Sequence, residues 1–582
     1  MHQQTTRFAD DDERLFLMED PQLGGRRRRR FIFGGADHGS RGLERLRRAD
    51  TTSRSREFSD SRRAPPTILR PRASTPVAVV SSKPHSADAR NVWHFLADAA
   101  ERAPDRVALR QGPRRASYRA VRDRAIALAA TLQQHGVRTG DRVAVLMHND
   151  LDHLVAYFGV PAAGAILVSL NARLTAQEQR GILDHSGARW LVHDQAHAER
   201  AAELPSTELR VPSGPAPNVT PRLLPADEPA QLYYTSGTTG SPKGVVLTHR
   251  NVCTHALAAI EELQLGERDT WAHIAPMFHL ADAWATFAIT AVAGAHVFLP
   301  QFTAPAALDL LADERVTITN LVPTMLNLMV KEPGAGDRSY ALRVMLSGGA
   351  PIAPDVVARI MQTFGCDYVQ TYGMTETSPY LTLSLLPDHL RALPPEQRLR
   401  WQAKTGRPFR GIELKVVDEH GEPVPRDDAT VGEIRVRGAT VTPGYWHNDA
   451  ATRAAFDEHG FLMTGDLATI DEHGFVDIKD RKKDVIKTGG ETVFSTEVEH
   501  VLYEHEAVLE CAVFGRPDAK WGERVTAAVV LRPNATASAD ELIAFCRERI
   551  AGYKTPKEIV FLATLPRTGS GKIKKRALRD LC

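Results

Sequence analysis

Cysteine is scarce in this sequence of 582 residues. The five cysteines stand at positions 253, 366, 511, 546 and 582, and none lies within four residues of another. This spacing excludes a zinc knuckle and a Cys-x-x-Cys redox pair. Unpaired cysteines are typical of proteins kept in a reducing compartment, so we expect buried free thiols and a cytoplasmic location.

An excess of one charge is also missing. The 73 basic and 71 acidic side chains leave a formal net charge of +2, which argues against a globally basic nucleic-acid-binding protein. Lysine is rare among the basic residues, with 15 lysines against 58 arginines. The few lysines therefore indicate positions that need a compact point charge, and Lys243, Lys483, Lys487 and Lys572 are candidates.

No long hydrophobic run is present. Residues 280–299 come nearest to the ~20 residues that a membrane span needs, but they include Asp282, Gly294 and His296. We expect a buried helix followed by a strand there. The longest apolar run in the first seventy residues is 15–18, which is too short for the core of a signal peptide.

Residues 1–84 differ in composition from the rest of the chain. They contain 18 basic and 11 acidic side chains without apolar periodicity, which predicts a disordered, arginine-rich tail. The run Arg26–Arg30 fits either a solvated part of this tail or a localisation or polyanion-binding patch. The eleven acidic residues argue against a mitochondrial transit peptide.

Regular hydrophobic periodicity begins near residue 91. Helical patterns alternate with short β-rich runs such as 142–147 and 165–170, which is typical of an α/β fold with a parallel sheet. From about residue 412 the pattern changes to short strands bounded by Gly and Asp, at 412–417, 432–437 and 474–479. These strands predict a small barrel or an antiparallel sheet, and a compact β/α pattern follows from 497 to the end.

The most informative segment runs from Tyr233 to Gly244 and reads YYTSGTTGSPKG. Its last ten residues contain five hydroxyl side chains, three glycines and one lysine. Glycines let successive backbone N–H groups point at a ligand, and hydroxyls and a lysine add further donors, so the segment predicts a cradle for phosphate oxygens. The spacing does not match the Walker A pattern. The candidate phosphate-binding residues are Thr235, Ser236, Gly237, Thr238, Thr239 and Lys243.

This segment resembles the signature of the adenylate-forming superfamily of acyl-CoA synthetases, firefly-type luciferases and nonribosomal-peptide adenylation domains. Other motifs follow in the family's order, and the resemblance extends from about residue 90 to residue 582. It implies an AMP-binding domain over 85–482, built from two α/β subdomains with parallel-type sheets and a small β-barrel. It also implies a small, mobile α+β domain over 483–582, and ATP, Mg²⁺ and CoA as cofactors.

Residues 368–376, YVQTYGMTE, resemble the second motif of the family. Tyr372 offers a flat face for adenine, Thr375 a hydroxyl for phosphate, and Glu376 a hard oxygen ligand for Mg²⁺. The resemblance implies that Thr235 shares the metal and has a catalytic role with Glu376. It also implies nucleotide contacts at Gln370, Thr371, Gly349 and Ala350, the last two in a small-residue wall between the adenine and acyl pockets.

Later motifs imply the remaining site residues. Asp466 resembles the carboxylate that accepts from both ribose hydroxyls, Arg481 resembles a second ribose contact, and Lys483 aligns with the hinge before the C-terminal domain.

Two further segments concern the acyl transfer and the acid. Lys487, Gly489 and Gly490 resemble the loop that lines the pantetheine channel. Lys572 resembles the catalytic lysine that bridges the substrate carboxylate and the α-phosphate, and His279 the residue at the mouth of the acyl pocket.

The resemblance implies an acid–thiol ligase of the fatty-acid–CoA ligase branch. The enzyme converts a carboxylic acid into acyl-AMP with release of pyrophosphate, and then transfers the acyl group to CoA. The Pro-Met-Phe-His form of residues 276–279 favours an acid without an amino group, although Asp282 lies close by and could pair an amine. The segment 386–408 resembles the insert of medium- and long-chain enzymes, whereas Trp284 lies one residue beyond the position of the family's gating tryptophan.

Three alternatives remain open at this point. The chain could be an acyl-AMP ligase that loads a carrier protein, or an aryl-CoA ligase of the coumarate type. A non-enzymatic ATP-binding regulator is the third, but such a protein would be expected to lack Lys572 or Glu376, and both are present.

Overall fold

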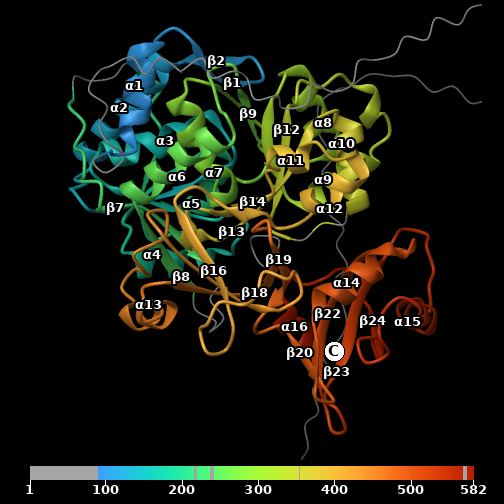
Figure 1. Ribbon diagram of the computed structural model, residues 1–582. Coiled ribbons are helices and arrows are strands. Elements are labelled where there is room, and N and C mark those ends of the chain that lie inside the picture. The colour runs from blue at the N-terminus through green and yellow to red at the C-terminus, as the bar shows by residue number, and fades with distance from the viewer. Residues whose placement is uncertain are drawn as a thin grey trace, which may run out of the picture. The chain divides into compact units, whose positions relative to one another are not determined.

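The computed structural model describes residues 90–214, 219–235, 242–350, 352, 354–567 and 573–581. The predicted tail at 1–84 lies outside these residues. The described chain contains three β-sheets up to residue 481 and a fourth sheet after it (Figure 1). The expected α/β class is confirmed by this arrangement.

The first sheet has six strands and carries the glycine-rich segment at one edge. Its strands run parallel except for the last pair, which forms an antiparallel hairpin. In spatial order they are β6 (Thr207–Leu209), β5 (Trp190–His193), β3 (Arg142–Leu146), β4 (Ile166–Ser169), β7 (Pro229–Thr235) and β8 (Lys243–Thr248). The central strands are fully buried apolar runs, as expected for strands covered on both faces.

The second sheet has nine strands. Its inner strands are parallel, and antiparallel strands flank them at both ends. In spatial order they are β15 (Arg407–Pro408), β14 (Tyr380–Leu383), β13 (Asp367–Gly373), β12 (Val344–Gly348), β11 (Ile318–Leu321), β9 (Thr270–His273), β10 (Ala295–Phe298), β1 (Val107–Gln111) and β2 (Arg114–Ser117).

Helices cover both of these sheets. One hydrophobic cluster joins strands of both sheets to α1 (Trp93–Arg102), α2 (Tyr118–Gln134), α3 (Leu151–Ala162), α6 (His249–Glu262) and α7 (Leu280–Ala291). The two sheets therefore share a core. The segment 280–299 forms the buried helix α7 followed by β10, which confirms the expectation from its sequence.

Three further helices, α8, α9 and α10, pack on the nine-stranded sheet. Figure 1 shows α8, α9 and α10 gathered beside β12, and their apolar side chains form a second cluster. The remaining helices up to residue 481 are α4 (Ala176–Ser186), α5 (Ala198–Ala202), α8 (Ala304–Asp313), α9 (Pro323–Lys331), α10 (Pro354–Phe364), α11 (Asp388–Arg391), α12 (Pro395–Gln402) and α13 (Asp449–Ala455).

The region predicted as a small barrel or antiparallel sheet has four antiparallel strands in chain order. They are β16 (Ile412–Val417), β17 (Gly432–Gly438), β18 (Leu462–Ile470) and β19 (Val476–Arg481). The last strand begins two residues later than the pattern at 474–479 predicts. Asp471 accepts hydrogen bonds from the backbone N–H groups of His473 and Phe475, and Gly474 has a φ of 81°, so these residues form a turn.

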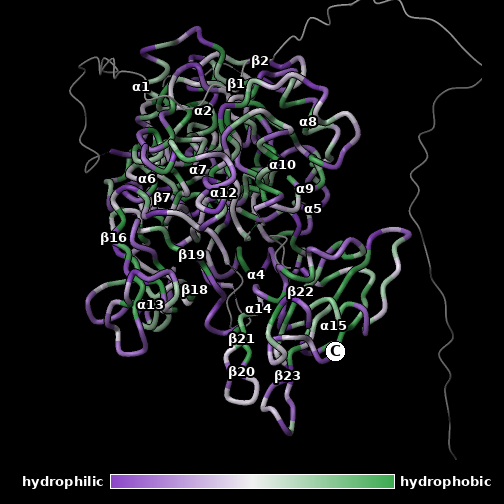
Figure 2. The backbone as a smooth tube through the Cα atoms, turned by 45° about the vertical axis from the view of Figure 1, so that its right-hand side comes forward, coloured by the Kyte–Doolittle hydropathy of each residue, from purple (hydrophilic) through white to green (hydrophobic). Residues whose placement is uncertain are grey.

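The C-terminal sheet contains β20 (Ile486–Thr488), β21 (Glu491–Val493), β22 (Val508–Asp518), β23 (Gly522–Leu531) and β24 (Glu558–Phe561). Helices α14 (Ser495–Glu504), α15 (Ala539–Arg547) and α16 (Lys575–Leu581) complete this part. Figure 2 shows the tip of the β22–β23 hairpin as hydrophilic, whereas the inner residues of both strands are buried.

Four of the five cysteines lie within the residues that the structure describes. Cys253, Cys366, Cys511 and Cys546 are free and buried, as predicted. Among the helices of the described ranges, none has the length and apolar character needed to cross a bilayer.

Candidate active site

The glycine-rich segment lies at the β7–β8 hairpin. Thr235 is the last residue of β7, Lys243 is the first of β8, and the two are directly paired across the ladder. Ser236, Gly237, Thr238 and Thr239 lie outside the described residues. The hairpin therefore holds Thr235 and Lys243 side by side at the base of the predicted phosphate loop.

Tyr445 connects this hairpin to the second motif. The ammonium group of Lys243 lies 5.0 Å from the centroid of the Tyr445 ring, and the Tyr445 hydroxyl donates to Glu376 Oε1 over 3.1 Å. Glu376 is 7% exposed. Burial, together with the negative charge of Glu376, raises the pKa of Tyr445, so its hydroxyl stays a donor. Tyr445 was not predicted as a site residue, because a tyrosine after a glycine has no distinctive pattern.

The small-residue wall and the second motif are brought together by sheet pairing. Strands β12 and β13 run parallel, with Gly348 paired to Thr371. The Thr371 hydroxyl donates to the Ser347 carbonyl over 3.1 Å, and a Cβ atom on Gly348 would overlap the Thr371 side chain. Gln370 donates from its side-chain amide to the Ala350 carbonyl over 3.0 Å, next to Gly349. The two motifs therefore lie on adjacent strands and are joined by side-chain hydrogen bonds.

A buried carboxylate lies at the centre of the predicted ribose site. Asp466 on β18 is 3% exposed, and its two oxygens have different partners. Tyr372 donates its hydroxyl to Oδ2 over 2.6 Å, and the Arg481 Nε atom lies 3.0 Å from Oδ1. Burial and the negative charge of Asp466 raise the pKa of Tyr372 well above its usual value, and the same carboxylate raises the pKa of Arg481.

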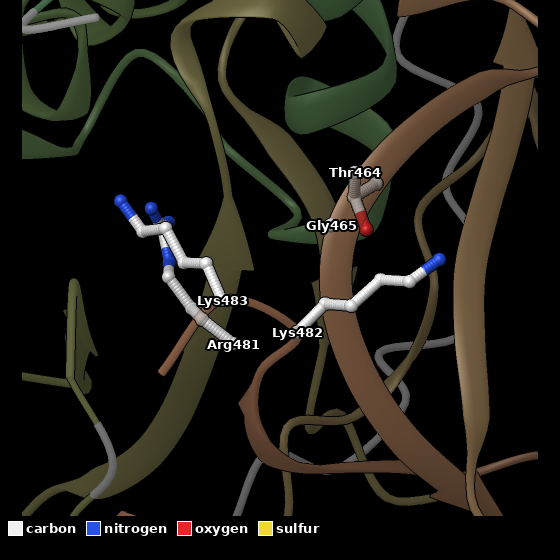
Figure 3. Close-up of a pocket in the computed structure, with 5 residues that line it drawn as sticks. All are labelled: Thr464, Gly465, Arg481, Lys482 and Lys483. Atoms are coloured by element: carbon white, nitrogen blue, oxygen red, sulfur yellow. The ribbon is translucent and has the colours of Figure 1, made fainter. Parts of the chain in front are cut away.

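A pocket opens beside this carboxylate. It has a volume of about 300 Å³ and is lined by Thr464, Gly465, Arg481, Lys482 and Lys483. Figure 3 shows the side chains of Arg481 and Lys483 extending to the same side, while Lys482 extends the opposite way. Lys482 contacts Glu433 over 3.2 Å. Arg481 and Lys483 therefore place two cationic groups on one side of the pocket, which suits a ligand that carries phosphate.

The predicted pantetheine loop is a tight hairpin in the C-terminal sheet. Gly489 and Gly490 join β20 to β21 as a two-residue turn with φ values of 60° and 87°. Positive φ at both positions is the requirement of a type I′ turn, and glycine meets it without steric cost. Lys487 donates to the Thr492 hydroxyl within the same hairpin over 2.6 Å. Lys572 lies outside the described residues.

His279 and Asp282 have separate environments. His279 immediately precedes α7, and its ring lies 4.8 Å from the Phe278 ring. Asp282, in the first turn of α7, is fully buried. Its Oδ2 lies 2.5 Å from His273 Nδ1, and its Oδ1 accepts from Trp271 Nε1 over 3.3 Å. Burial raises the pKa of Asp282. His273 and Trp271 therefore already contact both oxygens of the carboxylate that was considered as a partner for a substrate amine.

Asp282→Asn should destabilise the fold more than it affects adenylation. A carboxamide has one acceptor oxygen for the two donors that face Asp282, so one buried donor loses its partner at a cost of about 1–3 kcal/mol. We expect a lower urea midpoint with an unchanged slope. Asp309→Asn, which removes a pair with Arg338 at a carboxylate 58% exposed, is the matched control and should leave the midpoint nearly unchanged. Normal stability of Asp282→Asn with lost acid binding would instead assign Asp282 to the substrate.

Trp284 is a core residue of α7. It is 2% exposed, and its ring lies 5.1 Å from the Trp271 and Tyr380 rings and 5.4 Å from the His255 ring. These contacts hold the side chain among aromatic neighbours. Trp284 also lies one residue beyond the position of the family's gating tryptophan, so we do not assign it a gating role.

Comparison with known proteins identifies the family. The sequence profile described as AMP-binding enzyme matches residues 96–446, and that of the AMP-binding enzyme C-terminal domain matches residues 497–572. The chain is 37% identical over 516 residues to the long-chain-fatty-acid–CoA ligase of Thermus thermophilus. The alignment covers 84% of this chain and 95% of the relative. The chain is 38% identical over 488 residues to a feruloyl-CoA synthase of an Amycolatopsis species, with coverages of 82% and 96%.

Solved structures agree. The o-succinylbenzoate CoA synthetase of Bacillus subtilis, in complex with its acyl-adenylate intermediate, superposes with a TM-score of 0.77 at 31% identity and covers 84% of this chain and 98% of its own. The chain therefore belongs to the AMP-binding enzyme family, and it is an acyl-CoA ligase of the adenylate-forming superfamily. Its cofactors are ATP, Mg²⁺ and CoA.

Proposed function

We propose that this enzyme activates a monocarboxylic, mostly apolar acid, of medium to long chain or arylalkyl type, and transfers it to CoA. The observation that carries the proposal is helix α7 behind His279. Its residues Leu280–Ala291 include no basic side chain that could pair a second carboxylate, and its single acidic residue, Asp282, is already engaged by His273 and Trp271. The named activities of a fatty-acid ligase and a feruloyl-CoA synthase among its relatives support an apolar acid.

A carboxylate is a poor electrophile, so the enzyme must first activate it. A carboxylate alone would have to expel oxide, so its oxygen attacks the α-phosphorus of ATP, the bond to pyrophosphate breaks, and a mixed anhydride forms. We assign the β7–β8 hairpin with Lys243 to the phosphates and Lys572 to the reacting carboxylate and α-phosphate. Fixed positive charge placed where charge develops is worth roughly 3 kcal/mol per contact.

One residue from each of the first two motifs suits Mg²⁺. Glu376 provides a buried carboxylate, and Thr235 a hydroxyl at the end of β7; both are the hard oxygen ligands that Mg²⁺ prefers. When bound, Mg²⁺ neutralises charge on the phosphate oxygens. Tyr445 holds Glu376 by its hydroxyl and lies under the Lys243 ammonium, so one side chain aligns the metal and phosphate ligands.

The nucleoside has its own set of residues. We assign the adenine to the surface formed by Gly349, Ala350, Gln370, Thr371 and Tyr372, with Thr375 toward phosphate. Asp466 and Arg481 are assigned to the ribose. After adenylation, rotation about the hinge near Lys483 would withdraw Lys572 and present the Gly489–Gly490 turn and Lys487 to the pantetheine arm of CoA.

A pyrophosphate-release assay over fatty, aromatic and dicarboxylic acids tests the acid class. We expect apolar monocarboxylic acids to give the highest kcat/KM, because helix α7, which we assign to the acyl site, has no basic side chain that could pair a second carboxylate. A preference for malonate or another short diacid would refute the proposal. A comparison of free CoA with a holo-carrier protein as acyl acceptor then distinguishes an acyl-CoA synthetase from a carrier-loading enzyme.

A cytoplasmic location stays a prediction.

A further inference from the structure

Three metal-ligating side chains converge at the carboxyl ends of two adjacent strands in the six-stranded sheet. Strands β3 and β5 are parallel neighbours, with Leu146 paired to His193. His148 follows the end of β3, Asp194 directly follows β5, and His197 ends the short 3₁₀ turn Gln195–His197. None of these three residues belongs to the adenylation motifs.

The side chains are close enough to share one ion. His197 Nδ1 lies 2.6 Å from Asp194 Oδ1, and His148 Nδ1 lies 3.4 Å from Asp194 Oδ2. The centroids of the two imidazole rings are 4.4 Å apart. One ligand atom from each of the three residues lies within 4.8 Å of the other two.

These separations suit a small tetrahedral ion. Zinc–nitrogen and zinc–oxygen bonds of about 2.0–2.2 Å place neighbouring ligand atoms about 3.3 Å apart in a tetrahedron. The 3.4 Å between His148 Nδ1 and Asp194 Oδ2 matches that value. The 2.6 Å between His197 Nδ1 and Asp194 Oδ1 is a hydrogen-bond distance, which would lengthen when an ion replaces the shared proton. Two imidazoles and one carboxylate form a donor set that favours Zn²⁺ and similar transition-metal ions over Mg²⁺.

The backbone holds this cluster in place. Asp194 accepts from the backbone N–H of His148 over 2.9 Å and from that of His197 over 3.0 Å, which fixes the carboxylate between the two rings. The His148 carbonyl in turn contacts His153 Nδ1 over 3.0 Å, and His153 is fully buried. A cap for the 3₁₀ turn would need only Asp194 and the His197 N–H, whereas the second imidazole has no part in such a cap.

We propose that His148, Asp194 and His197 bind one divalent transition-metal ion, preferably Zn²⁺, with water in the fourth position. The ion would connect the ends of β3 and β5, separately from the Mg²⁺ that accompanies ATP. The next residue, Asn149, donates to the His273 and Ala275 carbonyls over 2.9 and 2.8 Å. It also accepts from the Met277 N–H over 2.8 Å. The bound ion would therefore stiffen the support of the loop that leads to His279.

Metal binding to the full-length, untagged protein tests this site. The protein is dialysed against EDTA, freed of chelator, and titrated with Zn²⁺ in excess Mg²⁺ without ATP, and bound metal is measured by mass spectrometry. We expect one Zn²⁺ per chain and a rise in Tm. Co²⁺ in place of Zn²⁺ should give visible d–d bands without thiolate-to-metal charge transfer, which separates this site from the cysteines.

Two variants and a matched control complete the experiment. Asp194→Asn loses the charged ligand and keeps an acceptor oxygen for only one of the two backbone N–H groups. His148→Gln/His197→Gln loses both imidazoles and leaves the Asp194 carboxylate in place. Each should weaken Zn²⁺ binding by ~100-fold or more and abolish the Tm rise. The control His420→Gln/His459→Gln removes two imidazoles that are 78% and 68% exposed and should bind normally. Absence of bound Zn²⁺ in the wild type, or unchanged binding in both variants, would overturn the proposal.

Discussion

Lys572→Ala should abolish pyrophosphate release from acid and ATP while thioester formation from premade acyl-AMP and CoA continues. The assigned role of this lysine is to offset charge on the reacting carboxylate and the α-phosphate, and both exist only during adenylation. Loss of one such contact typically lowers a rate by ~10²–10³-fold, which both assays can resolve. The thioester assay starts from premade acyl-AMP, after the step in which that charge develops. The rate of thioester formation should therefore fall much less.

Gly490→Leu should have the opposite effect. The β20–β21 turn leaves open space where a Cβ atom on Gly490 would lie, and we assign that space to the approach of the pantetheine arm in the second pose. A leucine there should allow adenylate to form and then stall the enzyme before the thioester. Since φ at this residue is 87°, any side chain strains the turn, and Gly490→Asn is the control because asparagine tolerates that region.

The two variants are informative as a pair. Melting temperature is measured for all three proteins, so that loss of the turn is distinguished from loss of access for CoA. If folded Lys572→Ala and Gly490→Leu each lose both half-reactions, a two-pose mechanism does not describe this enzyme. Equal effects of Leu and Asn at 490 would show that the turn conformation, and not the space above it, is what matters.

Much of the fold follows from local patterns in the sequence. The buried helix and strand over 280–299 were predictable because Asp282 and His296 are the only ionisable residues in a mostly apolar segment that Gly294 interrupts. The start of β19 was misplaced by two residues, since Asp471 forms a turn whose hydrogen bonds reach Phe475. The Asp471 side chain competes with the neighbouring strand for these backbone N–H groups, and a hydropathy pattern does not show which of the two bonds them.

The site likewise contains residues that the motifs predicted and contacts that the sequence did not reveal. The motifs predicted Asp466 and Arg481 each as a ribose contact, and the β18–β19 register places the two residues directly opposite. By contrast, Tyr445 is joined to Glu376 across 69 positions, and Asp282 to His273 by a buried contact between a strand and a helix. Contacts of this kind depend on which elements become neighbours in space, so a single sequence could suggest Asp282 as an amine ligand but could not show its actual partners.

Asp466→Asn should lower kcat/KM for ATP by ~10²-fold or more. The carboxylate has acceptor capacity left on both oxygens after bonding Tyr372 and Arg481, and we assign that capacity to the ribose hydroxyls. Hydrogen bonds to a charged group contribute about 1.5–3 kcal/mol each, so replacing two of them with neutral or mismatched contacts produces this loss. Tyr372→Phe removes one bond that orients the carboxylate and should cost about tenfold.

Substitution of the nucleotide shows whether the loss arises at the ribose. The wild type should use ATP in preference to 2′-deoxy-ATP by at least about tenfold, because one charged hydrogen bond is missing from the analogue. Asp466→Asn should use the two nucleotides almost equally, since the group that distinguishes them is gone. Glu433→Gln, which removes a buried carboxylate paired with Lys482 in the same sheet, is the matched control and should keep the wild-type preference. A folded Asp466→Asn enzyme that still discriminates as the wild type does would place the ribose elsewhere and leave Asp466 as a structural partner of Arg481.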